Sequence, residues 1–286
     1  MVTLNLDVRQ LKKERSRSFQ WNLVSKSPEM KMQTCRCGGI RLLCLVALGL
    51  AMLPAGAWGQ SGDFTVSQNG KPVGTARFSF SPSQAGGLDS TSTVRVDMQG
   101  LNYALSKTEE LSPTRNLVHV QLSASVNSSA VNVTAKPEGS QLLMNISANG
   151  RSSTTRLAQH NQAVFMADFD PGAFETLLAL AAKSNSRDLW AIIPKQAGSV
   201  QAVQLATYPD EQGTLDGRAT TVHHLVATIA GLSTDLFAGD ENQLLQAELP
   251  QDGFALVRKG FVLKPPSKAP APPPALPANP QQGTPQ

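Results

Sequence analysis

The sequence predicts a mainly β domain (α+β), in which an antiparallel meander carries one packed helix over residues 60–263. Two observations predict the sheet: apolar residues recur with a period of two, and the links between candidate strands carry hairpin residues. A third observation, one segment whose apolar residues follow a helical period, predicts the helix.

Alternation is clearest over residues 118–126 and 142–148, where apolar side chains alternate with mostly polar ones. Successive side chains of a strand point to opposite faces, so this pattern indicates a sheet with one buried and one wet face. The same interpretation predicts ten further strands: 63–68, 73–80, 91–98, 103–109, 130–136, 189–193, 200–207, 220–229, 244–249 and 254–263.

The turns support sequential pairing of these strands. Asn69-Gly70 and Asn149-Gly150 are strong type I′ hairpin signals, because both central residues of that turn need positive φ. We expect Asp252-Gly253 to form the same turn between the last two strands. Short links of this kind favour an up-and-down meander over βαβ units.

A single segment departs from the strand pattern. Asp170 stands where an N-cap is expected, and Pro171 follows at the first helical position. Apolar residues then recur at i, i+3, i+4 and i+7 from Phe174 to Ala181, which predicts a helix over about 171–183. We expect its apolar stripe to pack on the sheet and cover part of the apolar face.

The first 59 residues read as a targeting segment. Twelve uncharged residues at 42–53 follow three basic residues and precede a stretch of small ones, as in a secretory signal peptide. We predict a signal peptide at 30–59 with cleavage before Gln60, or alternatively before Trp58. An uncleaved anchor is the other alternative. Residues 1–29 are interpreted as a gene-model extension, with a long n-region as the alternative.

Export to the periplasm or the extracellular space follows from this prediction, without a membrane span in the mature chain. All three cysteines, Cys35, Cys37 and Cys44, precede the cleavage site. The mature domain is therefore expected to have no disulfide and to depend on its core. Nine of the last 22 residues are proline, so 264–286 is predicted to be a disordered tail.

Charge argues against a nucleic-acid partner. The formal charge of the whole chain is +4, but residues 1–59 hold nine Lys+Arg and three Asp+Glu. The remainder carries a net charge of −2. The basic character therefore belongs to the front segment rather than to the domain, and we predict no nucleic-acid binding.

The domain resembles a class of exported bacterial proteins of unknown function. The resemblance rests on the opening Asn69-Gly70 turn followed by Val73-Gly74, and on the two closing strands at 244–250 and 254–261. In general pattern it is similar to the lipoprotein-localisation-factor class. That likeness implies one strongly curved sheet, an open half-barrel, with helical cover. No functional residue of those carriers has a counterpart here.

The histidines indicate no metal site. Four follow residue 60: His119, His160, His223 and His224. His223 and His224 are adjacent on a predicted strand, so they point to opposite faces and cannot hold one ion together. We expect ordinary strand histidines, no metal and no cofactor.

The charged residues give no catalytic motif either. Asp168 and Asp170 lie two apart, but Asp170 is assigned to the helix cap and Asp168 to a loop. The basic pair Arg258-Lys259 is expected to be a wet edge, or alternatively to touch an anionic membrane surface. Two acidic pairs are expected to be solvated in turns: Glu109-Glu110 and Asp240-Glu241.

These observations favour an exported, non-catalytic envelope protein. It would bind a hydrophobic ligand such as a lipid, or another envelope component, on the apolar face of its curved sheet, which the helix partly covers; no binding residue is assigned. A hydrolase-type enzyme with a site assembled from His223, His224, Asp168 and Glu110 is the first alternative. A purely structural surface protein is the second.

Overall fold

The computed structural model describes residues 60–183, 188–195 and 197–265. The predicted extension, the signal peptide with its three cysteines, and all but the first two residues of the proline-rich tail lie outside the described residues. The described residues belong to one compact unit, which is described by itself.

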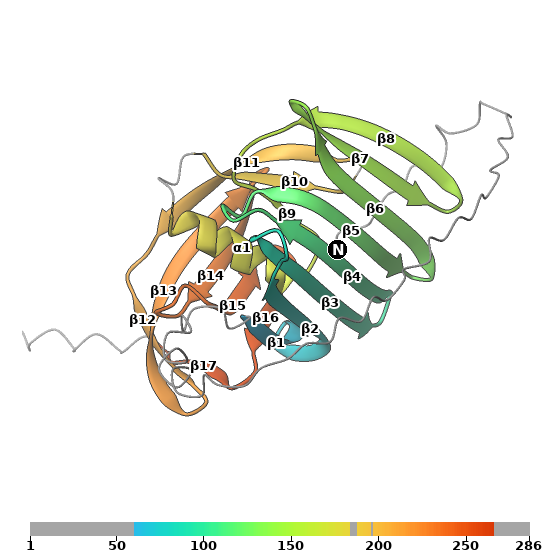
Figure 1. Ribbon diagram of the computed structural model, residues 1–286. Helices are drawn as coiled ribbons and strands as arrows, with labels where there is room; N and C mark the ends of the chain where they lie inside the picture. The colour runs from blue at the N-terminus through green and yellow to red at the C-terminus, as the bar shows by residue number, and fades with distance from the viewer. Residues whose placement is uncertain (1–59, 184–187, 196, 266–286) are drawn as a thin grey trace, which may run out of the picture. The chain divides into compact units, whose positions relative to one another are not determined.

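The first half of the domain is the predicted meander (Figure 1). Each strand pairs antiparallel with the next. The strands are β1 (Ser61–Gln68), β2 (Lys71–Pro82), β3 (Leu88–Met98), β4 (Leu101–Leu111), β5 (Leu117–Val126), β6 (Ser129–Glu138), β7 (Gln141–Ala148) and β8 (Arg151–Ala158).

Two of the predicted hairpin turns have the expected backbone. Asn69 and Gly70 have φ of 49° and 75°, and Asn149 and Gly150 have 51° and 73°. The prediction for Asp252-Gly253 was wrong, because only Gly253 has a positive φ, 66°. Leu249 pairs with Phe254, so four residues form this loop instead of two.

The second half returns along the other side of β1. Its strands are β9 (Ala163–Phe165), β10 (Trp190–Ile193), β11 (Ser199–Thr207), β12 (Glu211–Leu215), β13 (Arg218–Ile229), β14 (Leu232–Ala238), β15 (Leu244–Leu249), β16 (Phe254–Arg258) and β17 (Phe261–Leu263). β1 pairs with both β2 and β16, which joins the two halves into one sheet. All pairs are antiparallel except β9–β10.

The sheet curves until its two ends approach each other. Following the hydrogen-bonded pairs, the sheet runs from β8 through β1 and β16 to β13, β11, β10 and β9. β9 contacts β5, and β11 contacts β8. Within the described residues no ladder joins those strands, so the sheet is not closed. The predicted fold class, a mainly β, curved antiparallel sheet with one helix, is confirmed.

Helix α1 (Pro171–Ala181) lies on the inner face of this sheet (Figure 1). Asp170 caps it as predicted, accepting from the backbone N–H groups of Gly172 and Ala173. The helix contacts β2, β3, β9 and β15. Phe174, Leu177 and Leu178 of the predicted stripe are buried, and Ala181 is partly buried. Glu175 and Thr176 on other faces are buried as well, because the curved sheet surrounds the helix.

The remaining differences from the predicted strands have physical reasons. The expected strand at 254–263 is interrupted after Arg258, where Gly260 takes a φ of 81° and β17 turns away to pair with β12. Those two strands cover a second, small core on the outer face, formed by Val222, Phe237, Leu245 and Phe261. Sequence alternation also missed four strands: β8, β9, β12 and β14.

Candidate functional site

An open groove of about 860 Å³ lies on the outer face of the meander. Its floor follows from strand register: outward residues of neighbouring strands stand directly opposite one another. One row crosses all six strands from β1 to β6, and the next row runs beside it from β2 to β6. The first row is Asp63, Arg77, Thr93, Ser106, Ser123 and Asn132; the second is Thr75, Arg95, Ala104, Ser125 and Ala130.

Small side chains make this face hollow. Beyond the two arginines, both rows consist of Ser, Thr, Ala and Asn, apart from Asp63 at one end, and these extend only a short distance from the sheet. Several of these groups can donate and accept hydrogen bonds, and Ser123 already donates to Asn132 at 2.8 Å. Six strands at about 4.8 Å spacing give a groove roughly 24 Å across the sheet.

Positive charge gathers at the β1–β3 end of the groove. Arg77 forms an ion pair with Asp63 at 2.6 Å, and the two side chains are 69% and 40% exposed. The hydrogen bond from Arg77, with Lys259 and Arg258 nearby, lowers the pKa of Asp63. Arg95 and Lys259 also line the groove. Three cations therefore face one carboxylate at this end.

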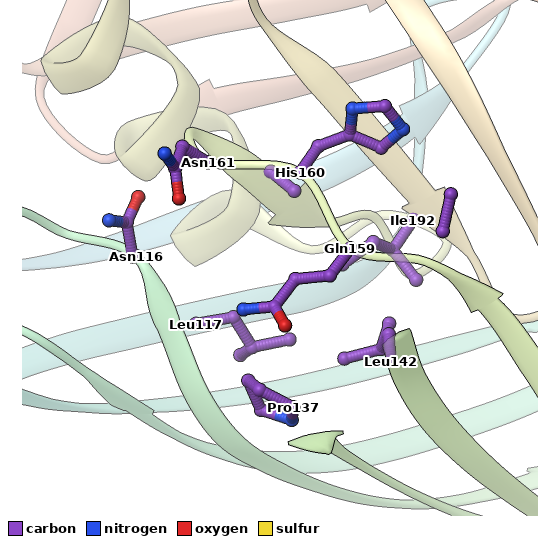
Figure 2. A pocket seen from close by; sticks show the side chains of 10 residues that line it. Asn116, Leu117, Pro137, Leu142, Gln159, His160, Asn161 and Ile192 are labelled. Carbon is purple, nitrogen blue, oxygen red and sulfur yellow. The ribbon is translucent and has the colours of Figure 1, made fainter. Parts of the chain in front are cut away.

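A second hollow, of about 70 Å³, lies where the two ends of the sheet approach each other (Figure 2). Gln159 reaches toward Leu117 and Pro137 from the link between β8 and β9. The ring of His160 stacks on Trp190 with centroids 3.7 Å apart. The small volume of this hollow suits a few waters rather than an extended ligand.

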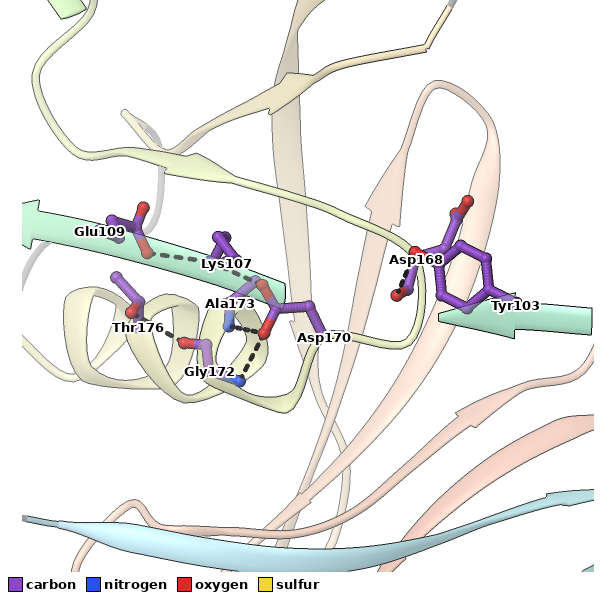
Figure 3. A network of polar contacts seen from close by, with 8 residues as sticks. All are labelled: Tyr103, Lys107, Glu109, Asp168, Asp170, Gly172, Ala173 and Thr176. Atoms are coloured by element: carbon purple, nitrogen blue, oxygen red, sulfur yellow. Dashed lines mark hydrogen bonds and ion pairs between the residues drawn. The ribbon is translucent and has the colours of Figure 1, made fainter. Parts of the chain in front are cut away.

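A buried ionic cluster holds the start of α1 against β4 (Figure 3). Lys107 Nζ lies 2.9 Å from Glu109 Oε2 and 2.6 Å from Asp170 Oδ2, and all three side chains are at most 1% exposed. Burial disfavours the ammonium, but the two carboxylates outweigh burial and raise the pKa of Lys107. Burial raises the pKa of Glu109, and Lys107 opposes that shift.

The prediction that Glu109 is solvated in a turn was therefore wrong. Every second residue of β4, starting with Tyr103 and Leu105, points into the core. Glu109 occupies one of these inward positions, so its carboxylate enters the core beside Lys107. Glu110 is half-buried, and opposite it on β5 stands His119. Asp240 and Glu241 are exposed, as expected.

Three of the four residues of the predicted hydrolase-type site contact separate partners. His223 contacts Asp210 at 2.9 Å, whereas His224 contacts Asp235 at 2.9 Å. Asp168 forms an ion pair with Lys195 at 2.7 Å, and its backbone carbonyl accepts from Tyr103. The two adjacent histidines thus face different surroundings, as their strand position predicts.

His224 is more enclosed than the sequence suggests. Its ring stacks between Tyr208 and Phe237, with centroid separations of 5.0 and 4.6 Å. Glu211 approaches its second nitrogen at 3.4 Å. Among residues 60–183, 188–195 and 197–265, no group of three or more His, Cys, Asp or Glu side chains has the geometry to hold a metal ion.

Arg258 and Lys259, which were predicted to form a solvated strand edge, have different contacts. Arg258 donates to the backbone carbonyls of Leu244 and Ser61, at 3.2 and 2.5 Å, and its guanidinium lies over Phe64. It is therefore an anchor of the β1–β16 region. Lys259 lines the groove.

A second buried acid, Glu175, sits on α1. Its carboxylate accepts from Leu244 N at 2.7 Å and from the side-chain amide of Gln60. Burial raises the pKa of Glu175 to about 7 from its ordinary 4.5, although Leu244, Arg258, Arg115 and Gln60 all favour the charged form.

This shift predicts a pH-dependent stability. The folded chain keeps the Glu175 proton up to about pH 7, whereas the unfolded chain loses it near pH 4.5. The free energy of unfolding should therefore fall as pH rises through that window, by up to about 3 kcal/mol. Glu175→Gln should remove most of this slope and exceed the wild type in stability at pH 8. Urea unfolding at several pH values measures it, with exposed Glu138→Gln as the control; an unchanged slope would contradict the assignment.

No family model matches this chain, and no curated protein matches it either. One similar solved structure is the crystal structure of a β-barrel-like protein of domain of unknown function DUF1849 from Brucella abortus. It shares 12% sequence identity with a TM-score of 0.48, over 72% of this chain and 97% of that one.

Sequence reasoning missed the groove, although the signal was present. Alternation over residues 118–126 had already placed Ser123 and Ser125 on the wet face of their strand. The hairpin turns at Asn69-Gly70 and elsewhere set the register that lines these positions up across strands.

No described helix is long and apolar enough to cross a membrane.

Proposed function

We propose that this chain is an exported, non-catalytic envelope protein that binds an acidic glycan in the groove on the outer face of β1–β6. The observation that carries the proposal is the pairing of a cationic end with a long hydroxyl-lined floor. A sugar chain offers hydroxyls to match Ser, Thr and Asn. A carboxylate or phosphate on that chain matches Arg77, Arg95 and Lys259.

The polar face supports this ligand better than a hydrophobic one. The apolar inner face carries α1, whose Phe174, Leu177 and Leu178 are at most 4% exposed. The outer face has the larger hollow and no comparable cover among the described residues. The proposal therefore keeps the envelope component that the sequence suggested and places it on the opposite face of the sheet.

Export rests on the signal-peptide pattern before Gln60, and the non-catalytic role rests on the separate partners of the candidate catalytic groups. His223, His224 and Asp168 are each held by a different charged partner. A binding protein needs no such group in its site.

Calorimetric titration of the mature protein tests the proposal. Oligogalacturonate and a phosphomannan oligosaccharide are the acidic probes, and a dextran oligomer of similar length is the neutral one. We expect at least one acidic probe to bind more tightly than dextran, and its affinity to fall with added salt. Equal or absent binding of all three would overturn the proposal.

Arg95→Gln is the sharpest variant for this site. Losing one charged hydrogen bond costs about 1.5 kcal/mol, so affinity for the acidic probe should fall roughly tenfold. Arg156→Gln, a change on β8 outside the groove lining, is the matched control and should leave the affinity unchanged. Both variants should have the same melting temperature as the wild type. Equal affinities for the two variants would contradict the assigned role of Arg95.

A further inference from the structure

The buried cluster at the start of α1 brings the amine of Lys107 and the carboxyl group of Asp170 into direct contact. Lys107 Nζ lies 2.6 Å from Asp170 Oδ2 in a buried ion pair. Glu109 Oε2 lies 2.9 Å from the same nitrogen. We propose that Lys107 and Asp170 condense into an amide between Nζ and Cγ, with Glu109 transferring the proton.

The helix terminus supplies an oxyanion site for this step. Asp170 Oδ1 accepts from Gly172 N at 2.9 Å and from Ala173 N at 3.3 Å. Attack of the amine on Cγ places negative charge on an oxygen. Two backbone N–H groups and the positive end of the helix dipole already stabilise charge at Oδ1. Oδ2, on the side of Lys107 and Glu109, is then the oxygen that leaves.

The condensation is balanced without an external reagent. The ammonium of Lys107 and the carboxylate of Asp170 together contain the atoms of one amide and one water. Glu109 accepts a proton from Nζ and passes it to Oδ2, so that a neutral amine faces a neutral carboxyl group. The lone pair of Nζ then forms the N–C bond at Cγ. A second proton moves from the nitrogen through Glu109 to Oδ2, and the C–O bond breaks to release water.

Condensation replaces two of the three buried charges with one neutral amide, which removes the desolvation penalty of those two groups. The carboxyl group of Glu109 remains, and burial raises its pKa, which favours its neutral form. Ser90 and Ser92 face Glu109 and Lys107 from β3, and neither buried hydroxyl has a hydrogen-bond partner among the described residues. They offer polar groups to the released water. The proton-transfer role also agrees with a Glu109 pKa raised by burial.

A cross-link here would connect β4 to α1, far apart in the chain. Residues 60–286 contain no cysteine, so no disulfide can perform that role. The amide would act on stability and is independent of the ligand proposed for the groove.

Peptide mapping of the purified, folded protein tests the bond. Trypsin cannot cleave after an acylated lysine, so Lys107 should remain inside peptide 96–115, joined to peptide 157–183 as one branched species. Its mass should be lower than the sum of the two peptides by one water, and fragmentation should place the branch at Lys107 and Asp170. Recovery of linear 96–107 and 157–183 in full yield would overturn the proposal.

Three variants separate the roles. Lys107→Arg keeps a cation and should give no branched peptide. Glu109→Gln should slow or abolish the branch, because it removes the proton acceptor. Asp170→Asn should still react but lose ammonia instead of water. If a variant fails to fold by circular dichroism, the wild-type map still decides. A wild-type branch that forms equally in Glu109→Gln would overturn the role of Glu109.

Discussion

Leu178→Asp is expected to abolish stable folding or to lower the melting temperature by tens of degrees. Leu178 is 3% exposed and lies on α1 inside the curved sheet. A carboxylate at this position would be buried on a face of the helix that packs in the hydrophobic core, and an unpaired buried charge costs several kcal/mol. That is a large part of the roughly 5–15 kcal/mol that stabilises a typical domain.

Two controls isolate burial as the cause. Leu178→Ala removes volume without adding charge and should cost about 2–5 kcal/mol. Leu232→Asp introduces the same charge at a leucine that is 61% exposed and should change stability by less than about 0.5 kcal/mol. Thermal unfolding followed by circular dichroism compares them. If Leu178→Asp had the same melting temperature as the wild type, α1 could not be buried inside the sheet.

Local signals account for the elements that the sequence predicted. In β5 and β7, buried Val120, Leu122, Leu142 and Met144 follow strict alternation, because one face of each strand meets the core. The N-cap at Asp170 could be predicted from the sequence because it depends on residues only two and three positions away. Such features need no knowledge of the rest of the fold.

The missed strands depend on distant partners. β8 has the sequence RSSTTRLA, in which both faces are mostly polar. Apolar and polar residues therefore hardly alternate, and the pattern does not predict a strand. β9 has only three residues and pairs with β10, which follows the helix. The pairing of β1 with β16 likewise joins the two ends of the domain. Composition and period within one segment carry no information about these contacts.

The buried ionic cluster was missed for a different reason. Tyr103 and Leu105 set the inward parity of β4, and that parity continues through Lys107 and Glu109 to Leu111. Assigning charged residues to solvent overrode the periodicity. The parity was the better guide, because Asp170 at the helix cap supplies the ion pair that makes the burial of Lys107 tolerable.

Lys107→Met is expected to destabilise the domain by at least about 3–5 kcal/mol, because it leaves buried carboxylates without their cation and also prevents the proposed amide. Here two groups lose their partner at once: the carboxylates of Glu109 and Asp170 remain buried without their shared cation. Urea unfolding at pH 7 measures the change. The loss should shrink at low pH, where the unpaired carboxylates can take up protons.

A compensated variant separates charge from packing. In Lys107→Met/Glu109→Gln/Asp170→Asn the same space is filled by neutral side chains, and Asn at position 170 can still cap the helix. Much of the stability lost in Lys107→Met should return, since neutral replacements for buried ion pairs often cost little. The recovery is measured against Lys107→Met, and neither variant can form the amide, so it reports charge alone. If the triple variant were as unstable as Lys107→Met, packing of the lysine stem would be the cause, and the cluster would stabilise the helix by volume rather than by compensation of charge.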